Sequence, residues 1–327
     1  MTETLRVAVL THGGYGAAAV VQEFVRRGRA PVAVVAETES RPKPKAGSPR
    51  KKRKGPLALL RAKTLELGPW QGAGFVLGRF GDRALRVVGL GSPDPFGFRF
   101  LRAAEKMWLR VLHCTLYGYP PGAYDPSERR LWSADEICRE RGIPYHRVRS
   151  LNSTEARAIL EALQADVFVL AGTRVLKPAT LRLARKVVLN KHSSLLPAYR
   201  GLKGEFWALY HGDLDRLGIT IHEVDPGLDT GPILLQEHLP FRKYDSHVSL
   251  RVRSQDLGAR LLVDAVERME KEPTWRGTPQ AAGDWPTYTA PTIEQLREYR
   301  TRLKGLWKRT DSRESRPQQD GERARGR

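Results

Sequence analysis

The chain of 327 residues is long enough for one large or two small domains, and 40% hydrophobic residues allow a substantial core. Its two cysteines, Cys114 and Cys138, have no metal-binding or redox spacing, which excludes a disulfide scaffold and a zinc ribbon. The N-terminus has no basic segment followed by a long apolar one, and 18 consecutive apolar residues occur nowhere. We therefore expect a cytoplasmic protein without a transmembrane segment.

The net charge of +20 is concentrated in two segments. Residues 41–54 hold eight Lys or Arg and no acidic residue, and residues 301–327 hold nine Lys or Arg against four acidic residues. Both are poor in core residues, so they cannot bury enough apolar area to offset the entropy lost on ordering. We predict that they are solvated and disordered, and the alternative is attraction to RNA or anionic lipid.

Apolar strands alternate with amphipathic helices along most of the chain. A strand over residues 5–10, a helix over 17–27 and a strand over 31–36 come first. After residue 132 we predict helices over 133–141, 154–164, 205–211, 246–271 and 293–307, a short helix from Pro178, and strands over 145–148, 167–171, 187–190, 218–223 and 233–239. Ser133 and either Asn152 or Ser153 are the predicted helix caps. This order indicates an α/β fold with a Rossmann-like, mostly parallel sheet and helices on both faces.

Ligands bind at the carboxyl ends of strands in such a sheet. This places candidate site residues in five segments: 11–16, 37–40, 172–177, 190–201 and 224–231. The first has the spacing Gly14-x-Gly16-x-x-Ala19 of a dinucleotide-binding turn, and Glu37 stands where an acid would meet a ribose hydroxyl. Any parallel α/β fold needs a short glycine turn into its first helix, so this indication of NAD is weak.

The segments 190–201 and 224–231 are more specific. Asn190 and His192 stand two residues apart at the end of a strand, so their side chains point the same way. A hydrogen-bonded structural histidine is the alternative for His192 alone. The turn Asp225-Pro-Gly-Leu-Asp229-Thr-Gly231 adds a carboxylate on a loop bracketed by glycines. Together an Asn, a His and an Asp form an acyl-transfer site without a nucleophile.

These motifs resemble those of the formyltransferase family, whose members transfer the formyl group of 10-formyltetrahydrofolate to an amine. The resemblance rests on N-x-H-x-S-L-L-P from Asn190 to Pro197, on Gly201, and on D-x-G-x-D-T-G from Asp225 to Gly231. With the flanking strands it extends over residues 165–240. It implies the formyltransferase fold, with 10-formyltetrahydrofolate as co-substrate and no metal.

The resemblance also implies roles for individual residues. Asn190 and His192 would donate hydrogen bonds to the oxygen of a tetrahedral intermediate, and Asp229 would take up the amine proton and orient the imidazole. The implied folate contacts are Arg174, Val175, Ser194, Leu195, Pro197, Asp225 and Gly227. The implied acceptor contacts are Gly13, Gly14, Tyr15 and Gly201. In place of a folate contact, Arg174 could be a solvated loop residue, and Leu195 could form part of the wall of the site. His12 is either an acceptor contact or a surface histidine.

Two features depart from the family pattern. Lys191 stands where relatives have an apolar strand residue, and we expect its side chain to point away from Asn190 and His192. Residues 41–131 form a basic linker and an insert with helical spacing over 57–67 and 100–112 around a Gly- and Pro-rich stretch. An insert of this length suggests a cover over the acceptor entrance or a homodimer contact. A membrane-surface helix over 100–113 is the alternative.

Only 96 residues follow Gly231, too few for the second β-barrel domain of methionyl-tRNA formyltransferases. We predict formyl transfer to a small amine: an amino sugar, an amino acid derivative or a nucleotide-linked amine. The alternatives are methionyl-tRNA formyltransferase-like activity, a formyltetrahydrofolate hydrolase, and a non-catalytic folate- or RNA-binding protein. The predicted domains are a catalytic domain (1–40 and 132–272), the linker and insert (41–131), a C-terminal extension (273–310) and a disordered basic tail (311–327).

Overall fold

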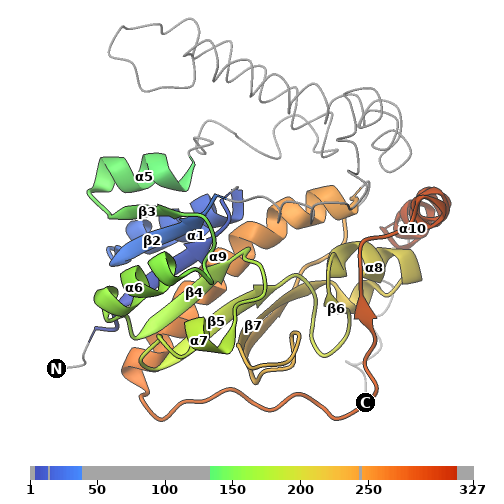
Figure 1. The fold of residues 1–327 in the computed structure, drawn as a ribbon. Coiled ribbons are helices and arrows are strands. Elements are labelled where there is room, and N and C mark those ends of the chain that lie inside the picture. The colour runs from blue at the N-terminus through green and yellow to red at the C-terminus, as the bar shows by residue number, and fades with distance from the viewer. Residues whose placement is uncertain (1–3, 14, 39–132, 243–244, 315–327) are drawn as a thin grey trace, which may run out of the picture.

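The computed structural model describes residues 4–13, 15–38, 133–242 and 245–314. Within them, a sheet has the strand order β3-β2-β1-β4-β5-β7-β8 (Figure 1). The first five strands in this order are parallel, and β7 and β8 are antiparallel to their neighbours. The strands are β1 (Val7–Thr11), β2 (Ala33–Glu37), β3 (Tyr145–Val148), β4 (Val167–Ala171), β5 (Val187–His192), β7 (Gly218–Glu223) and β8 (Ile233–His238). This architecture confirms the predicted α/β fold; the predicted insert lies outside the described residues.

Helices cover both faces of the sheet because successive strand residues point to opposite sides. Val7 and Val9 of β1 join one core with helices α1 (Tyr15–Arg26), α5 (Ala134–Arg141) and α9 (His247–Lys271). Ala8 and Leu10 join a second core with α6 (Thr154–Leu163) and the loop that leads to α7 (Pro178–Leu181). The two layers are visible on either side of the sheet in Figure 1.

The helix starts follow the predicted capping residues. The Ser153 hydroxyl accepts a hydrogen bond from the Ala156 amide at 3.1 Å, and Glu136 accepts one from the Ser133 amide at 2.9 Å. Pro178 occupies the first turn of α7, where its missing N–H costs nothing. Strand β5 extends two residues beyond its predicted end, because Lys191 and His192 pair with β7.

The C-terminal part builds a third core beside the sheet. It consists of the two-residue strands β6 (Arg200–Gly201) and β9 (Thr287–Tyr288), α8 (Gly204–His211), the 3-10 helix η1 (Leu214–Arg216) and α10 (Ile293–Glu314). Tyr299 of α10 is fully buried, with its ring 4.6 Å from that of Phe206. Helix α10 continues to Glu314, into the segment predicted as a disordered tail from residue 311. No glycine or proline interrupts it between Gly305 and Pro317.

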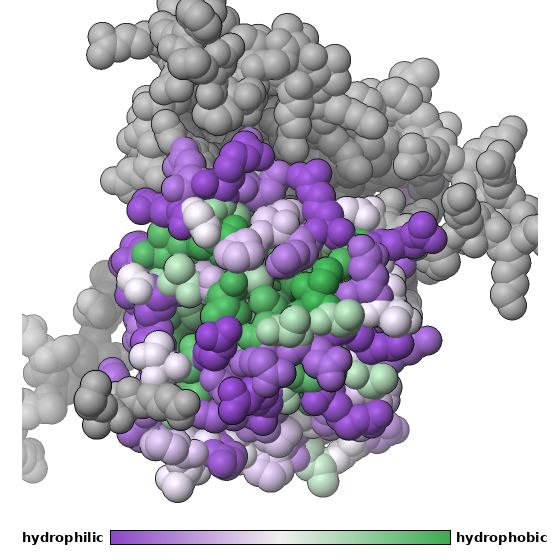
Figure 2. All heavy atoms as spheres, turned by 60° about the vertical axis from the view of Figure 1, so that its left-hand side comes forward, coloured by the Kyte–Doolittle hydropathy of each residue, from purple (hydrophilic) through white to green (hydrophobic). Residues whose placement is uncertain are grey.

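The surface of the described residues is mixed in character. Figure 2 shows apolar residues in the middle of one face, with hydrophilic residues at its margins. Three large apolar side chains are strongly exposed: Val175 at 79%, Leu202 at 60% and Leu228 at 47%. None of the described helices is long and apolar enough to cross a membrane.

Candidate active site

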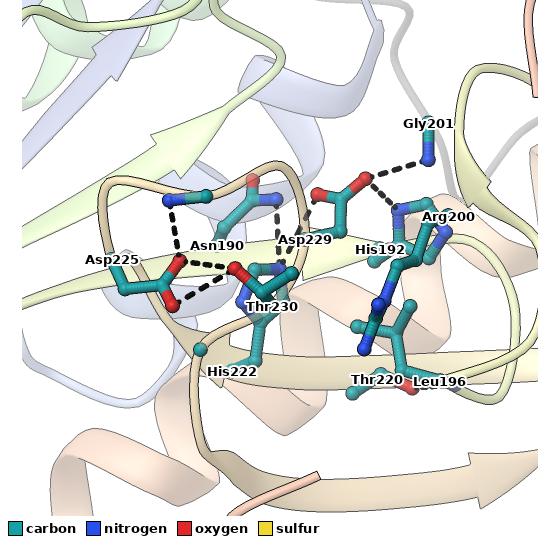
Figure 3. Close-up of polar contacts among 12 residues, drawn as sticks. Asn190, His192, Leu196, Arg200, Gly201, Thr220, His222, Asp225, Asp229 and Thr230 are labelled. Atoms are coloured by element: carbon teal, nitrogen blue, oxygen red, sulfur yellow. Dashed lines mark hydrogen bonds and ion pairs between the residues drawn. The ribbon is translucent and has the colours of Figure 1, made fainter. Parts of the chain in front are cut away.

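Strands β5 and β7 supply the polar side chains of the site. In their antiparallel register Asn190 lies opposite His222, and His192 lies opposite Thr220. All four share one face of the sheet, because they alternate with Leu189, Ile219 and Ile221, which join the core under α9. Figure 3 shows these side chains gathered under the loop that carries Asp229.

The hydrogen bonds of His222 define its tautomer. Its Nδ1 lies 2.8 Å from the Glu223 carbonyl oxygen, which can only accept, so Nδ1 carries the proton. Its Nε2 therefore accepts from the Asn190 side-chain amide, at 3.1 Å. Burial lowers the pKa of His222, which keeps the ring neutral at physiological pH. His222 thus orients the Asn190 amide and leaves its second N–H able to donate to a substrate oxygen.

His192 and Asp229 lie in contact in the site. The His192 Nε2 donates to the Tyr199 carbonyl oxygen at 2.9 Å, so this nitrogen carries a hydrogen. The other ring nitrogen, Nδ1, lies 3.4 Å from Asp229 Oδ2. His192 Nδ1 therefore faces one carboxylate oxygen of Asp229, and His222 Nε2 lies 3.6 Å from the other, Oδ1. The carboxylate is placed between two imidazole rings.

Asp229 reaches this pair by an unexpected path. Because β7 runs antiparallel to β5, its carboxyl end does not lie at the carboxyl ends of the parallel strands, as the sequence interpretation assumed. The loop after β7 instead folds back over the sheet. Asp225 closes this loop by accepting from the Gly227 amide at 3.1 Å and the Thr230 hydroxyl at 2.7 Å (Figure 3). Asp229 itself has a left-handed backbone, with φ of 54°.

The structure therefore brings Asn190, His192 and Asp229 together, and their catalytic roles stay predictions. Gly201, a predicted acceptor contact, donates its amide to Asp229 Oδ2 at 2.8 Å. In this arrangement the Gly201 amide orients the carboxylate.

The predicted folate contacts have different surroundings. Val175 is exposed, and its carbonyl oxygen accepts from the Asn152 side chain at 3.0 Å. Ser194 is fully buried and its hydroxyl donates to the Ala198 carbonyl oxygen, so no part of this residue is exposed to a ligand in this structure. Leu195 is partly buried and Pro197 is buried. Arg174 lies 3.3 Å from the buried carboxylate of Glu37. Glu37, the ribose contact in the NAD interpretation, is thus already paired with Arg174.

The predicted acceptor loop follows β1. The Gly13 amide donates to the Thr11 hydroxyl at 2.9 Å, and Tyr15 begins α1. Gly14 lies outside the described residues. His12 is exposed, and its ring and its backbone amide both contact the Gly172 carbonyl oxygen. The loop therefore adjoins the loop after β4.

The sequence interpretation did not identify His222 or Thr220. Both lie in the predicted strand 218–223 at alternate positions, with the same spacing as Asn190 and His192. Thr220 donates to the Ser194 carbonyl oxygen at 2.7 Å and accepts from the Leu196 amide at 3.0 Å, which supports the turn after β5. Polar residues at every second position of an otherwise apolar strand were the available signal.

Lys191 points to the opposite face of the sheet, which confirms the prediction. Its ammonium group donates to Gln255 of α9, and Gly258 leaves room for its stem, since a Cβ there would lie 2.0 Å from Lys191 Cδ. Burial lowers the pKa of Lys191 to about 8, against opposing effects of Asp256 and Glu205.

We expect Lys191→Met to stabilise the protein near neutral pH. The unfolded chain has an ordinary lysine pKa of 10.5 and the folded chain one of about 8, so wild-type stability rises with pH between these values. The variant lacks this penalty and should be more stable by about 1–3 kcal/mol at pH 7. Urea unfolding of both proteins at about pH 7 and pH 10 measures the difference, which should shrink at the higher pH. An equal or reversed difference at both pH values would contradict the expectation.

Among the residues that the structure describes, no group of three or more His, Cys, Asp or Glu side chains could hold a metal ion.

Residues 109–266 match the family model described as formyl transferase. Over this segment, about half of its length, the chain is similar to the formyltransferase family. Methionyl-tRNA formyltransferase of Paramagnetospirillum magneticum is 34% identical over 200 residues, which cover 61% of this chain and 64% of that protein. A methionyl-tRNA formyltransferase of Synechococcus sp. is 39% identical over 137 residues, 41% of this chain and 42% of that protein. The chain thus spans less than two thirds of the length of these formyltransferases.

A solved structure of glycinamide ribonucleotide transformylase 1 from Symbiobacterium toebii is also similar. It is 20% identical, with a TM-score of 0.48, over 82% of this chain and 88% of that chain.

Proposed function

We propose that this formyltransferase moves the formyl group of 10-formyltetrahydrofolate to an amine. The observation that carries the proposal is the convergence of the side chains of Asn190, His192 and Asp229 in one partly buried cluster. The similarity to the formyltransferase family supports the same reaction, because the motifs that define the resemblance supply these three residues.

The three side chains suit acyl transfer to an amine. The free N–H of the Asn190 amide donates a hydrogen bond to the carbonyl oxygen as negative charge develops on it. A proton on His192 Nδ1, the ring nitrogen that Tyr199 does not use, would donate a second one. Asp229 accepts the proton that the attacking amine must lose, directly or through water, and would return it to the folate nitrogen as the bond from that nitrogen to the formyl carbon breaks. His222 stays neutral and holds the Asn190 amide in its donating orientation.

The loops 172–177 and 225–229 would hold the folate, which supplies the formyl group when bound. Each loop exposes a large apolar side chain, Val175 and Leu228, which suits contact with a flat aromatic ring. Asp225 is engaged in closing its own loop, and Gly227 keeps that turn compact. We propose that these two residues shape the pocket and that the ring's polar atoms meet backbone groups.

For the acceptor we propose a small amine bound at the loop of Gly13, Gly14 and Tyr15. A second candidate is methionyl-tRNA, favoured by the 34% identity to a methionyl-tRNA formyltransferase. In that case the basic segments 41–54 and 301–327 would contact RNA. The homodimer contact assigned to the insert stays a prediction, because residues 41–131 lie outside the described part of the chain.

We also propose the division into a catalytic domain (1–40 and 132–272), a linker and insert (41–131) and a C-terminal extension from residue 273. The third core shows that the described extension packs on α8, so the extension would belong to the folded catalytic unit.

Incubation with 10-formyltetrahydrofolate tests the function. One arm holds a pool of small amines and another holds methionyl-tRNA, and mass spectrometry detects the formylated product. Formylation of one acceptor supports the proposal and identifies its class. Free formate without any acceptor would indicate a hydrolase, and no binding of a folate analogue would overturn the proposal.

A further inference from the structure

The segment that follows α9 crosses the molecule to reach β9 and α10 (Figure 1). Its residues 277–288, called the strap here, contact the two segments that hold Asp229. Thr278 exchanges two backbone hydrogen bonds of 2.8 Å with Ile233, just after the Asp229 loop. At its other end β9 pairs with β6, so Tyr288 lies beside Gly201. A Cβ on Gly201 would lie 2.4 Å from the Tyr288 carbonyl oxygen, so this approach requires glycine.

Gln280 makes the central contacts of the strap. Its side-chain amide donates to the Asp229 carbonyl oxygen at 2.9 Å and to the Gly231 carbonyl oxygen at 2.8 Å. Its side-chain oxygen accepts from Arg200 at 2.8 Å. The amide nitrogen of Gln280 thus binds the Asp229 loop, and its amide oxygen binds Arg200, the residue before Gly201.

These contacts close a ring around the carboxylate of Asp229. The ring runs from the Asp229 carboxylate to the Gly201 amide, through Arg200 to Gln280, and back to the Asp229 backbone. The left-handed backbone of Asp229 is uncommon for a residue with a side chain, and it persists only where surrounding contacts fix it. Two of the carbonyl groups of this turn are bound by the Gln280 amide.

We propose that Gln280 is a positioning residue that holds Asp229 against His192 and so sets the rate of proton transfer. The inference rests on the proposed formyl transfer. Gln280 touches no reacting atom and acts through Asp229 alone. It lies outside residues 109–266, which match the family model. Among side chains of this length, only glutamine combines two N–H donors for the carbonyl groups with an oxygen acceptor for Arg200.

Two substitutions separate this role from simple packing. Gln280→Glu keeps the length and the Arg200 contact but turns acceptors toward two carbonyl oxygens. Gln280→Met keeps the volume and removes all hydrogen bonds. We expect kcat to fall about tenfold in both, with KM for each substrate within about twofold, because a small misplacement of a catalytic group slows chemistry more than binding. Asp284→Ala, at an exposed position of the same strap, is the matched control and should keep wild-type kcat.

A double variant tests whether Gln280 acts through Asp229. Gln280→Met added to Asp229→Asn should cause no further loss of kcat, whereas independent losses would multiply. Multiplying losses, or wild-type kcat in Gln280→Glu, would overturn the proposal.

A readout without activity separates this inference from the proposed function. Amide hydrogen exchange of residues 225–231 should be faster in both Gln280 variants than in Asp284→Ala. If the exchange rates of residues 225–231 are the same in the Gln280 variants and in Asp284→Ala, Gln280 does not position Asp229, even if the enzyme is active. A different outcome is possible: the wild-type chain transfers no formyl group, while amide exchange of residues 225–231 still depends on Gln280. That result would refute the proposed function, and with it the effect of Gln280 on catalysis, but not its contact with Asp229.

Discussion

Asp229→Asn is expected to lower kcat about 10³-fold, since a general base of this kind contributes 10²–10⁴-fold. The amide cannot take the amine proton, and it removes the negative charge that lies beside His192 Nδ1. Asparagine keeps the shape of aspartate, tolerates a left-handed backbone and can still accept from the Gly201 amide. The loop should therefore stay in place, and the loss should reflect chemistry. Single-turnover measurements of formyl transfer at saturating folate and acceptor quantify it.

Asp284→Asn is the control for this substitution, because it makes the same change at an exposed position. It should keep full activity, and both variants should unfold at a temperature close to that of wild type. A loss of less than about tenfold in Asp229→Asn would show that another group takes the proton.

Asn190→Ala is expected to lower kcat by about 10²–10³-fold, the typical cost of removing one donor to a developing oxyanion. The donor acts mainly in the transition state, so KM for the folate should change little. The variant also removes the partner of His222 Nε2. Steady-state kinetics with both substrates varied measure the two parameters separately.

Binding of a folate analogue is the control for Asn190→Ala. An unchanged dissociation constant shows that the pocket is intact. If kcat stays near wild type, Asn190 is a structural residue. If KM rises with kcat unchanged, its hydrogen bond already forms fully in the ground state.

The sheet was predictable because its residues carry a local signal. The run from Val7 to Leu10 is apolar at every position, which is typical of a strand covered on both faces, and the structure buries all of it. The sequence likewise narrowed the cap of the next helix to Asn152 or Ser153 from their position before an amphipathic segment, and the structure shows that Ser153 is the cap.

The candidate site was predictable only where its residues lie close in sequence. Asn190 and His192 share a face because they are two residues apart in one strand. The reversal of β7 and the contact between Asp229 and Gln280, 51 residues apart, depend on tertiary folding and leave no such pattern. The contact between Lys191 and Gln255 was not predictable for the same reason, because Gln255 follows 64 residues later in the sequence.

The strap has a consequence for how the protein matures on the ribosome. A growing chain that has reached Lys271 already carries every strand of the seven-stranded sheet, and Asn190, His192 and Asp229 with it. It still lacks Gln280, strand β9, which pairs with β6, and helix α10, whose Tyr299 completes the third core. Formyl transfer should therefore appear late in synthesis, after the strap has emerged. A segment that is translated after all the reacting groups would thus raise the rate at a site that is already assembled.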